Sequence, residues 1–273
     1  MSLPEFNTLT IALSEHIADI RLNRPEKSNA LNATMWQEIR QVFEWVDCSP
    51  DARVAILSGE GKNFCAGIDL AMLTGIQQQI ANPDGARSRE TLRHIILDLQ
   101  ACLSSIERCR KPVLAAIHGA CIGGALDLVT CCDMRYVASD AAFSIKEIDI
   151  GMIADVGTLQ RLPRLIGEGN ARELAFTGRT VNADEAISLT LANRAFPSKE
   201  ALLGGVREIA TRISKKSPLA IRGTKEILNY SRDHSIADGL NYVATWNAAM
   251  LLSADLKESM TAQHENRPPS FQD

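Results

Sequence analysis

Short apolar segments of strand length alternate along this chain with longer segments of helical periodicity. The runs 54–57 and 113–117 are aliphatic throughout, which is typical of strands buried on both faces. The segments 32–46 and 92–109 place their apolar side chains three or four positions apart, as one face of a helix requires. Strands that alternate with helices predict an α/β fold.

The other strand candidates lie in the first two thirds of the chain. Residues 9–13 and 17–22 alternate apolar and polar side chains like paired strands, and residues 134–137 and 142–145 also favour strands. The polar stretch 74–89 is expected to be a surface loop or a short helix.

No further strand is expected beyond about residue 195. Helices are predicted there at residues 199–214, 217–231 and 236–252. We therefore expect an α/β core at 1–197 and a helical C-terminal region at 198–273. No linker is long enough to indicate independent domains.

The composition excludes several classes of protein. A net charge of −4 without charge blocks gives no electrostatic footprint for nucleic acid or an anionic membrane. No apolar run approaches 18 residues, and the first residues lack the features of a signal peptide. We therefore expect a soluble protein. A bacterial cytoplasm is favoured, and a mature organellar form is the alternative. The five histidines show no metal-ligand spacing, so no metal is predicted.

Three acidic residues stand in apolar segments. Asp127 lies within Gly123–Val129, and Glu147 and Asp155 lie within Phe143–Gly157. Burying an ionised acid costs on the order of several kcal/mol of desolvation, unless the acid is paired or takes part in the chemistry. A group of such acids therefore indicates proton-transfer chemistry.

Each of these acids also has a structural interpretation. Asp127 can be a core acid paired with an arginine. Glu147, on a segment that alternates like a strand, can be an exposed strand acid. Asp155 precedes a probable helix start, where aspartate is a common N-cap.

Two glycine turns can supply amide donors to the same site. Asn63–Leu70 follows a strand and contains Gly67, and Ile117–Gly124 runs from a strand into a helix start. Unpaired N–H groups at a helix start favour negative charge. Two such amides that face one carbonyl oxygen would form an oxyanion hole.

Five motifs in order along the chain resemble the enoyl-CoA hydratase/isomerase (crotonase) superfamily: Asn23–Asn32, Phe64–Leu70, Ala116–Gly124, Cys132–Tyr136 and Gly157–Pro163. The resemblance implies an enzyme built as a spiral of ββα units that binds acyl-coenzyme A thioesters. It also implies assembly as a homotrimer or homohexamer, with region 198–273 used for oligomerisation. No cofactor is implied beyond the coenzyme A of the substrate. The backbone N–H groups of Ile68 and Gly124 are expected to hold the thioester oxygen.

The acids distinguish between branches of this family. Hydratases that resemble the chain carry glutamates at positions 127 and 147 and usually glycine at 155, whereas this chain has Asp127, Glu147 and Asp155. This trio resembles the Δ3,5-Δ2,4-dienoyl-CoA isomerases of fatty acid β-oxidation. The resemblance implies Glu147 as the base at carbon 2 and Asp155 as the acid at carbon 6. Asp127 would tune or support the pair.

Substrate-binding residues follow from the same motifs. They are expected to be Arg24, Lys27, Ala66, Gly67, Ile68, Asp69, Leu70 and Gly124. Arg24 and Lys27 are candidates for the phosphates of coenzyme A, although both can instead be solvated surface charges. The alternatives in function are an enoyl-CoA hydratase, a Δ3-Δ2-enoyl-CoA isomerase, and a non-enzymatic trimeric scaffold or RNA-binding relative.

Overall fold

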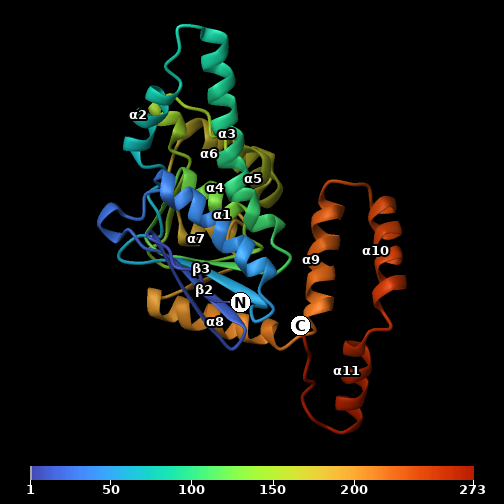
Figure 1. The fold of residues 1–273 in the computed structure, drawn as a ribbon. Coiled ribbons are helices and arrows are strands. Elements are labelled where there is room, and N and C mark those ends of the chain that lie inside the picture. The colour runs from blue at the N-terminus through green and yellow to red at the C-terminus, as the bar shows by residue number, and fades with distance from the viewer. Residues whose placement is uncertain (1) are drawn as a thin grey trace.

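A six-stranded sheet forms the centre of the computed structural model, which describes residues 2–273 (Figure 1). Its strands are β1 (Leu9–Ser14), β2 (Ile17–Leu22), β3 (Val54–Gly59), β4 (Val113–Ile117), β6 (Met134–Ala138) and β9 (Arg194–Phe196). They lie in the order β1-β2-β3-β4-β6-β9. β1 and β2 pair antiparallel and all later neighbours pair in parallel, as the α/β prediction requires.

Helices cover both faces of this sheet. On one face, α1 (Ala33–Cys48) and α3 (Gly85–Arg108) enclose the main core together with the side chains of Ala55, Leu57 and Ala115. On the other, α8 (Lys199–Ser214) packs Leu202, Val206 and Ala210 against alternate strand residues, among them Ile56 and Leu114. Because both faces are buried, strands β3 and β4 carry no polar alternation.

A small second sheet lies beside the first. It contains β5 (Ala120–Ile122), β7 (Ala142–Ser144) and β8 (Val181–Asn182) in the order β5-β7-β8. The chain passes from β4 to β5 at Gly119, which has φ +55°. The Cα of Gly119 faces the Lys62 carbonyl, and an added methyl group would clash with that oxygen. Only glycine fits at this position. The connection leads the chain from the six-stranded sheet directly into the small second sheet.

Short helices complete the core. They are η1 (Pro25–Lys27), α2 (Leu70–Gln79), α4 (Gly124–Thr130), η2 (Glu147–Ile150), α5 (Thr158–Ile166), α6 (Glu168–Thr177) and α7 (Ala183–Ser188). The stretch 74–89 contains the end of α2, a short connection and the start of α3, whose N-termini are capped by Asp69 and Asp84. The short helix expected there is present. One element differs from the sequence predictions. Glu147 is not on a strand, since β7 ends at Ser144 and η2 begins at Glu147.

The last three helices extend from the body as an arm (Figure 1). The arm is formed by α9 (Pro218–Arg232), α10 (Ile236–Met250) and α11 (Ala254–His264). The tail after α11 returns to the body, where Arg53 Nη2 donates to the Phe271 carbonyl at 2.6 Å. Region 198–273 thus has two structural parts, because α8 belongs to the core and α9–α11 to the arm.

No helix within residues 2–273 has both the length and the apolar character needed to cross a bilayer. No group of three or more His, Cys, Asp or Glu side chains in the described residues is arranged to hold a metal ion.

Candidate active site

The loop of Gly67 to Asp69 is held against Leu31 by a two-bond parallel bridge. Leu31 N–H donates to the Gly67 carbonyl at 2.8 Å, and Asp69 N–H donates to the Leu31 carbonyl at 3.0 Å. In a parallel bridge the residue between these two bonds turns its own N–H to the opposite side. The N–H of Ile68 therefore faces away from Leu31.

The second amide belongs to Gly124, the first residue of α4. A methyl group built on Gly67 would lie 3.4 Å from Gly124 N, and one built on Gly124 would lie 3.7 Å from Ile68 N. Within residues 2–273 neither N–H has a hydrogen-bond acceptor. The structure thus brings the two predicted oxyanion residues together as a pair of free donors.

A buried asparagine that the sequence analysis missed supports this loop. Asn29 is fully buried with φ +55°, and its Nδ2 donates to the carbonyls of Glu60, Asn63 and Phe64 at 2.9, 2.9 and 3.1 Å. Asparagine is one of the few residues that tolerates this backbone conformation. The only sequence signal for its role was its place inside the first family motif.

Arg24 also supports the loop. Its guanidinium forms an ion pair with Asp69 at 3.0 Å and donates to the Ala30 carbonyl. This pairing lowers the pKa of Asp69, mainly through the hydrogen bond from Arg24. Arg24 is therefore already engaged in holding the residue next to Ile68, whereas Lys27 is exposed on η1. A contact of either with the phosphates of coenzyme A stays a prediction.

The other predicted substrate-binding residues surround the amide pair. Gly67 is buried, whereas Ala66 and Leu70 are exposed on either side of the loop. Leu70 begins α2 with an exposed fraction of 65%. Asp69 has a structural use in addition to its ion pair, because its Oδ1 accepts from Ala71 N at 3.1 Å and caps α2.

Asp127 is fully buried on α4 and has one hydrogen-bonded oxygen. Its Oδ1 accepts from the Thr158 N–H, the first amide of α5, at 2.5 Å, and its Oδ2 is buried without a partner. The N-cap of α5 is Gly157, which offers no side chain. Asp127 rather than Asp155 therefore satisfies the N-terminus of α5, and Asp155 is free of the capping role.

Glu147 and Asp155 lie in the chain segments that border Asp127. A methyl group built on Gly123 would lie 3.0 Å from Glu147 Oε1, so this carboxylate sits beside the turn that leads to Gly124. Glu147 Oε2 is buried without a partner. Asp155 is half-buried, and its carbonyl accepts from Gln100 Nε2 at 2.6 Å.

Burial makes all three acids unusually reluctant to ionise. It raises the pKa of Glu147 to about 7, with further contributions from the charges of Asp127 and Asp155. It raises the pKa of Asp127 to about 6 against the opposing hydrogen bond from Thr158. Burial also raises the pKa of Asp155. Acids that exchange protons near neutral pH are suited to general acid–base work.

Cys65 and His118 adjoin the amide pair but have structural environments. Cys65 Sγ donates to the Asn29 carbonyl at 3.0 Å, and burial raises the pKa of this thiol to about 12. His118 is buried with its Nε2 at 3.1 Å from the Gly61 carbonyl, and burial lowers its pKa. Neither group is activated as a nucleophile or base.

The chain is similar to known proteins over nearly its whole length. The family model described as enoyl-CoA hydratase/isomerase matches residues 12–273. The peroxisomal Δ(3,5)-Δ(2,4)-dienoyl-CoA isomerase of Arabidopsis thaliana is 48% identical over 275 residues, covering 99% of each chain. The human mitochondrial enzyme of the same name is 49% identical over 254 residues, which cover 93% of this chain and 77% of that protein.

Solved structures share the fold. The crystal structure of an enoyl-CoA hydratase from Bacillus anthracis superposes with a TM-score of 0.88 at 30% sequence identity, covering 97% of this chain and 99% of that one. A putative enoyl-CoA hydratase from Streptomyces coelicolor gives a TM-score of 0.88 at 27% identity. The predicted crotonase-like α/β fold is thereby confirmed.

The relatives contradict the expected location. Those described above from plant and human are named as peroxisomal and mitochondrial proteins, so the expectation of a bacterial cytoplasm was wrong. It rested on features missing from the first residues, and such an absence carries no positive information about a compartment. The family itself is established by the match over residues 12–273 and by relatives near 48% identity: the chain belongs to the enoyl-CoA hydratase/isomerase family.

Proposed function

We propose that this protein is an isomerase that converts a 3,5-dienoyl-CoA to a 2,4-dienoyl-CoA in fatty acid oxidation. One observation carries the proposal: three acids with raised pKa values border a pair of free backbone amides. A hydratase needs two acids to hold a water, and the third acid, Asp155, has no use in that reaction. The names of the plant and human relatives support the same activity.

The reaction begins with the thioester oxygen bound to the N–H groups of Ile68 and Gly124. These donors stabilise the negative charge that develops on the oxygen when a proton leaves carbon 2. Glu147 is the base that takes this proton. Because its pKa is about 7, a large share of the molecules carry the ionised form at neutral pH. The raised pKa also makes this carboxylate a stronger base toward the carbon 2 proton.

The second proton transfer occurs at the far end of the diene. The electron pair released at carbon 2 forms a double bond between carbons 2 and 3. The π pair of carbons 3 and 4 moves to carbons 4 and 5, and the π pair of carbons 5 and 6 forms the new C–H bond at carbon 6. Carbon 6 then accepts a proton from Asp155, whose pKa is raised by burial so that it holds this proton more firmly than an exposed aspartate. Asp127 keeps negative charge beside both groups and tunes them. No electrons are gained or lost, so no redox cofactor is required.

Asp155→Asn is the decisive test of this mechanism. The variant should lower kcat on 3,5-dienoyl-CoA by about 100-fold, the lower range for loss of a general acid. Glu147 remains, so exchange of the carbon 2 proton with deuterated water should persist. Formation of the conjugated 2,4-diene is followed by its absorbance. Asp184→Asn, an exposed acid on α7, is the matched control.

The same preparations separate the rival activities. Hydration of a 2-enoyl-CoA at a rate comparable to diene formation would favour the hydratase, which the likeness to hydratase structures keeps as the second candidate. An Asp155→Asn variant that isomerises the diene at the parent rate would refute the two-acid mechanism.

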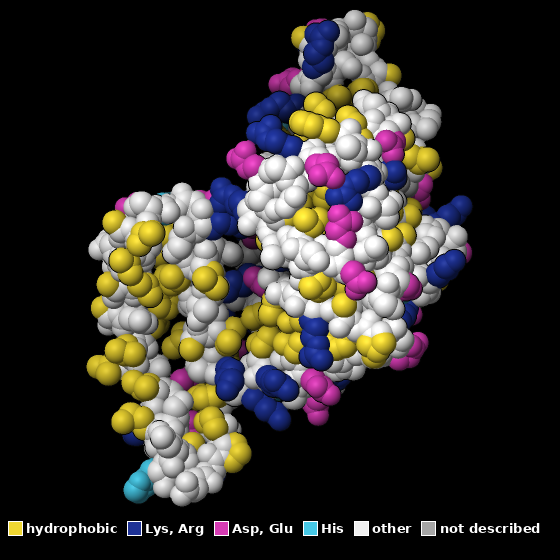
Figure 2. Space-filling model, turned by 180° about the vertical axis from the view of Figure 1, so that it is seen from behind, with side chains coloured by type: hydrophobic (Ala, Val, Ile, Leu, Met, Phe, Trp, Pro, Cys, Tyr) yellow, Lys and Arg dark blue, Asp and Glu magenta, His cyan; other side chains and the backbone are white. Residues whose placement is uncertain are grey.

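We also propose that the arm joins copies of the chain into a trimer or hexamer. Figure 2 shows hydrophobic side chains gathered over the arm. Ile236, Leu240 and Leu252 are exposed to 84%, 64% and 92%, and an apolar surface of this kind is typical of a subunit interface.

Light scattering should give a mass about three or six times 29.8 kDa. Ile236→Glu together with Leu240→Glu should lower that mass, because the introduced charges would be buried in the interface. A parent protein that stays at the single-chain mass over micromolar concentrations would contradict the proposal.

A further inference from the structure

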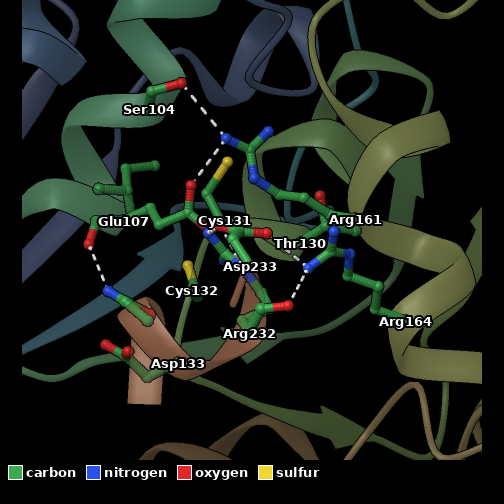
Figure 3. Close-up of polar contacts among 12 residues, drawn as sticks. Ser104, Glu107, Thr130, Cys131, Cys132, Asp133, Arg161, Arg164, Arg232 and Asp233 are labelled. Atoms are coloured by element: carbon green, nitrogen blue, oxygen red, sulfur yellow. Dashed lines mark hydrogen bonds and ion pairs between the residues drawn. The ribbon is translucent and has the colours of Figure 1, made fainter. Parts of the chain in front are cut away.

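A polar cavity lies behind the segment that carries Asp155. It has a volume of about 450 Å³ and lies between α3, α5 and the end of α9. Figure 3 shows charged side chains from all three helices pointing toward one another at this place. The mechanism described above uses none of them. The cavity is lined by Gln100, Ser104, Glu107, Arg161, Arg164, Arg232 and Asp233, among others.

One face of α3 holds the acid-bearing segment through three side chains. Gln100, Ser104 and Glu107 are four and three positions apart and so share a face of the helix. Gln100 Nε2 binds the Asp155 carbonyl at 2.6 Å. Arg161 Nη2 donates to Ser104 Oγ at 3.2 Å and to Glu107 Oε2 at 3.0 Å. The segment 155–161 is thus anchored to α3 at both ends.

Arg161 folds back over the first turn of its own helix. A methyl group built on Gly157 would lie 1.9 Å from Arg161 Nη1, so the guanidinium covers the Cα of Gly157. The next residue is Thr158, whose N–H binds Asp127. The anchored guanidinium therefore fixes the peptide that presents this N–H, and it places a positive charge near a buried carboxylate.

Glu107 also connects the arm to the body. Glu107 Oε1 accepts from Arg232 Nη1 at the end of α9. Asp233 then bonds to Arg232 Nη2 at 3.1 Å and to Arg164 Nη1 at 2.7 Å. The pair of Arg161 and Glu107 is shielded from solvent, with exposed fractions of 17% and 18%, where an ion pair is screened less than on the surface.

We infer that Arg161 is a positioning residue of the isomerisation: held by Ser104 and Glu107, it fixes the Thr158 N–H on Asp127 and balances the negative charge of the acid group. This inference rests on the proposed function, because it assigns to Arg161 an effect on that reaction. Arg161 touches no reacting atom in this assignment.

The sign of its electrostatic effect follows from the groups around Asp127. These are the carboxyls of Glu147 and Asp155, the guanidinium of Arg161, and the thiols of Cys121 and Cys131. Among the charged ones, only Arg161 lowers the pKa of Asp127. Loss of this cation makes Asp127 hold its proton to higher pH.

Arg161→Gln tests the inference, with Arg164→Gln as the matched control on the same helix and in the same cavity. In Arg161→Gln, kcat should fall about tenfold with KM within about twofold, as expected for misplaced catalytic groups. Its pH–rate profile should shift, because the pKa of Asp127, which is coupled to Glu147, rises when the cation is lost. Arg161→Lys should restore the position of the profile, and Arg164→Gln should match the parent.

A second readout does not depend on activity. Hydrogen exchange of the Thr158 amide should be faster in Arg161→Gln and in Glu107→Gln than in the parent. Glu107→Gln retains the cation, so it should leave the pH–rate profile in place. This variant also keeps the inference testable if Arg161→Gln fails to fold. An unshifted profile with unchanged Thr158 exchange in a folded Arg161→Gln would overturn the inference. A parent enzyme without isomerase activity would refute the proposed function instead, and Thr158 exchange would still test the anchoring.

Discussion

Glu147→Gln should lower kcat for diene isomerisation by about 1,000-fold, within the range for loss of a general base. The amide has nearly the shape of the carboxylate but cannot accept the proton from carbon 2. Glu147 Oε2 is buried without a partner, so the substitution removes no hydrogen bond of that oxygen. Rates are measured by diene absorbance, and Glu168→Gln on the surface of α6 is the control.

The pH dependence of this variant gives a second check. The pKa of Glu147 is raised to about 7, and a base acts in its ionised form, so the parent rate should increase as the pH rises through about 7. Glu147→Gln should lose this limb. A variant that keeps both the limb and more than a tenth of the rate would place the base elsewhere.

As the pH rises, the stability of the parent protein should fall while its activity increases. A carboxyl with a raised pKa in the folded state binds its proton more tightly than in the unfolded chain, so ionisation at higher pH costs folding free energy. The parent should lose stability as the pH rises from the ordinary pKa of glutamate through about 7. Glu147→Gln lacks this loss, so thermal unfolding at pH 8 should show it at least as stable as the parent.

Gly67→Ala should lower kcat by about 100-fold or more through displacement of the amide pair, as for loss of one oxyanion donor. Gly67 has φ +91°, and its added methyl group would lie 2.6 Å from the Ile122 carbonyl and 3.4 Å from Gly124 N. The loop must shift, and the N–H of Ile68 shifts with it. Steady-state kinetics and circular dichroism would separate loss of catalysis from loss of fold.

Gly75→Ala is the matched control for this substitution. Its added methyl group meets nothing within 4 Å on α2, and alanine favours a helix over glycine by about 1 kcal/mol. This variant should keep the parent kcat. Equal losses of activity in Gly67→Ala and Gly75→Ala would mean that the amide pair is not the oxyanion site.

The sequence predicted the elements that depend on local pattern. Helix α8 and the strands β3 and β4 lie where their apolar spacing placed them, because burial on one or both faces leaves a direct mark on the residue order. The acids stood out for a related reason, since a charged residue such as Asp127 is unusual in an apolar segment. The roles of these acids came from the family resemblance rather than from the pattern.

Contacts between distant segments could not be predicted from the residue order. Asp127 satisfies the amide of Thr158, 31 positions further along, and this contact relieves Asp155 of the capping role that its sequence position favours. Arg24 lay in a motif expected to bind phosphate, and its ion pair with Asp69 was not predicted. The spacing also did not predict that Arg161 reaches α3. Each of these pairings is decided by the packing of whole elements, which local spacing does not encode.

The proposed oxyanion donors at Ile68 and Gly124 are backbone amides, whereas the proposed acid and base are side chains, and the two respond differently to substitution. Side-chain substitution cannot delete a main-chain donor, so the proposed contact with the thioester oxygen persists as long as the two turns keep their shape. The acids at 127, 147 and 155 are ordinary side chains, each open to replacement by a single substitution. Under the proposed mechanism, a new reaction on the same class of substrate therefore requires few changes, and the pair of amides need not be built again.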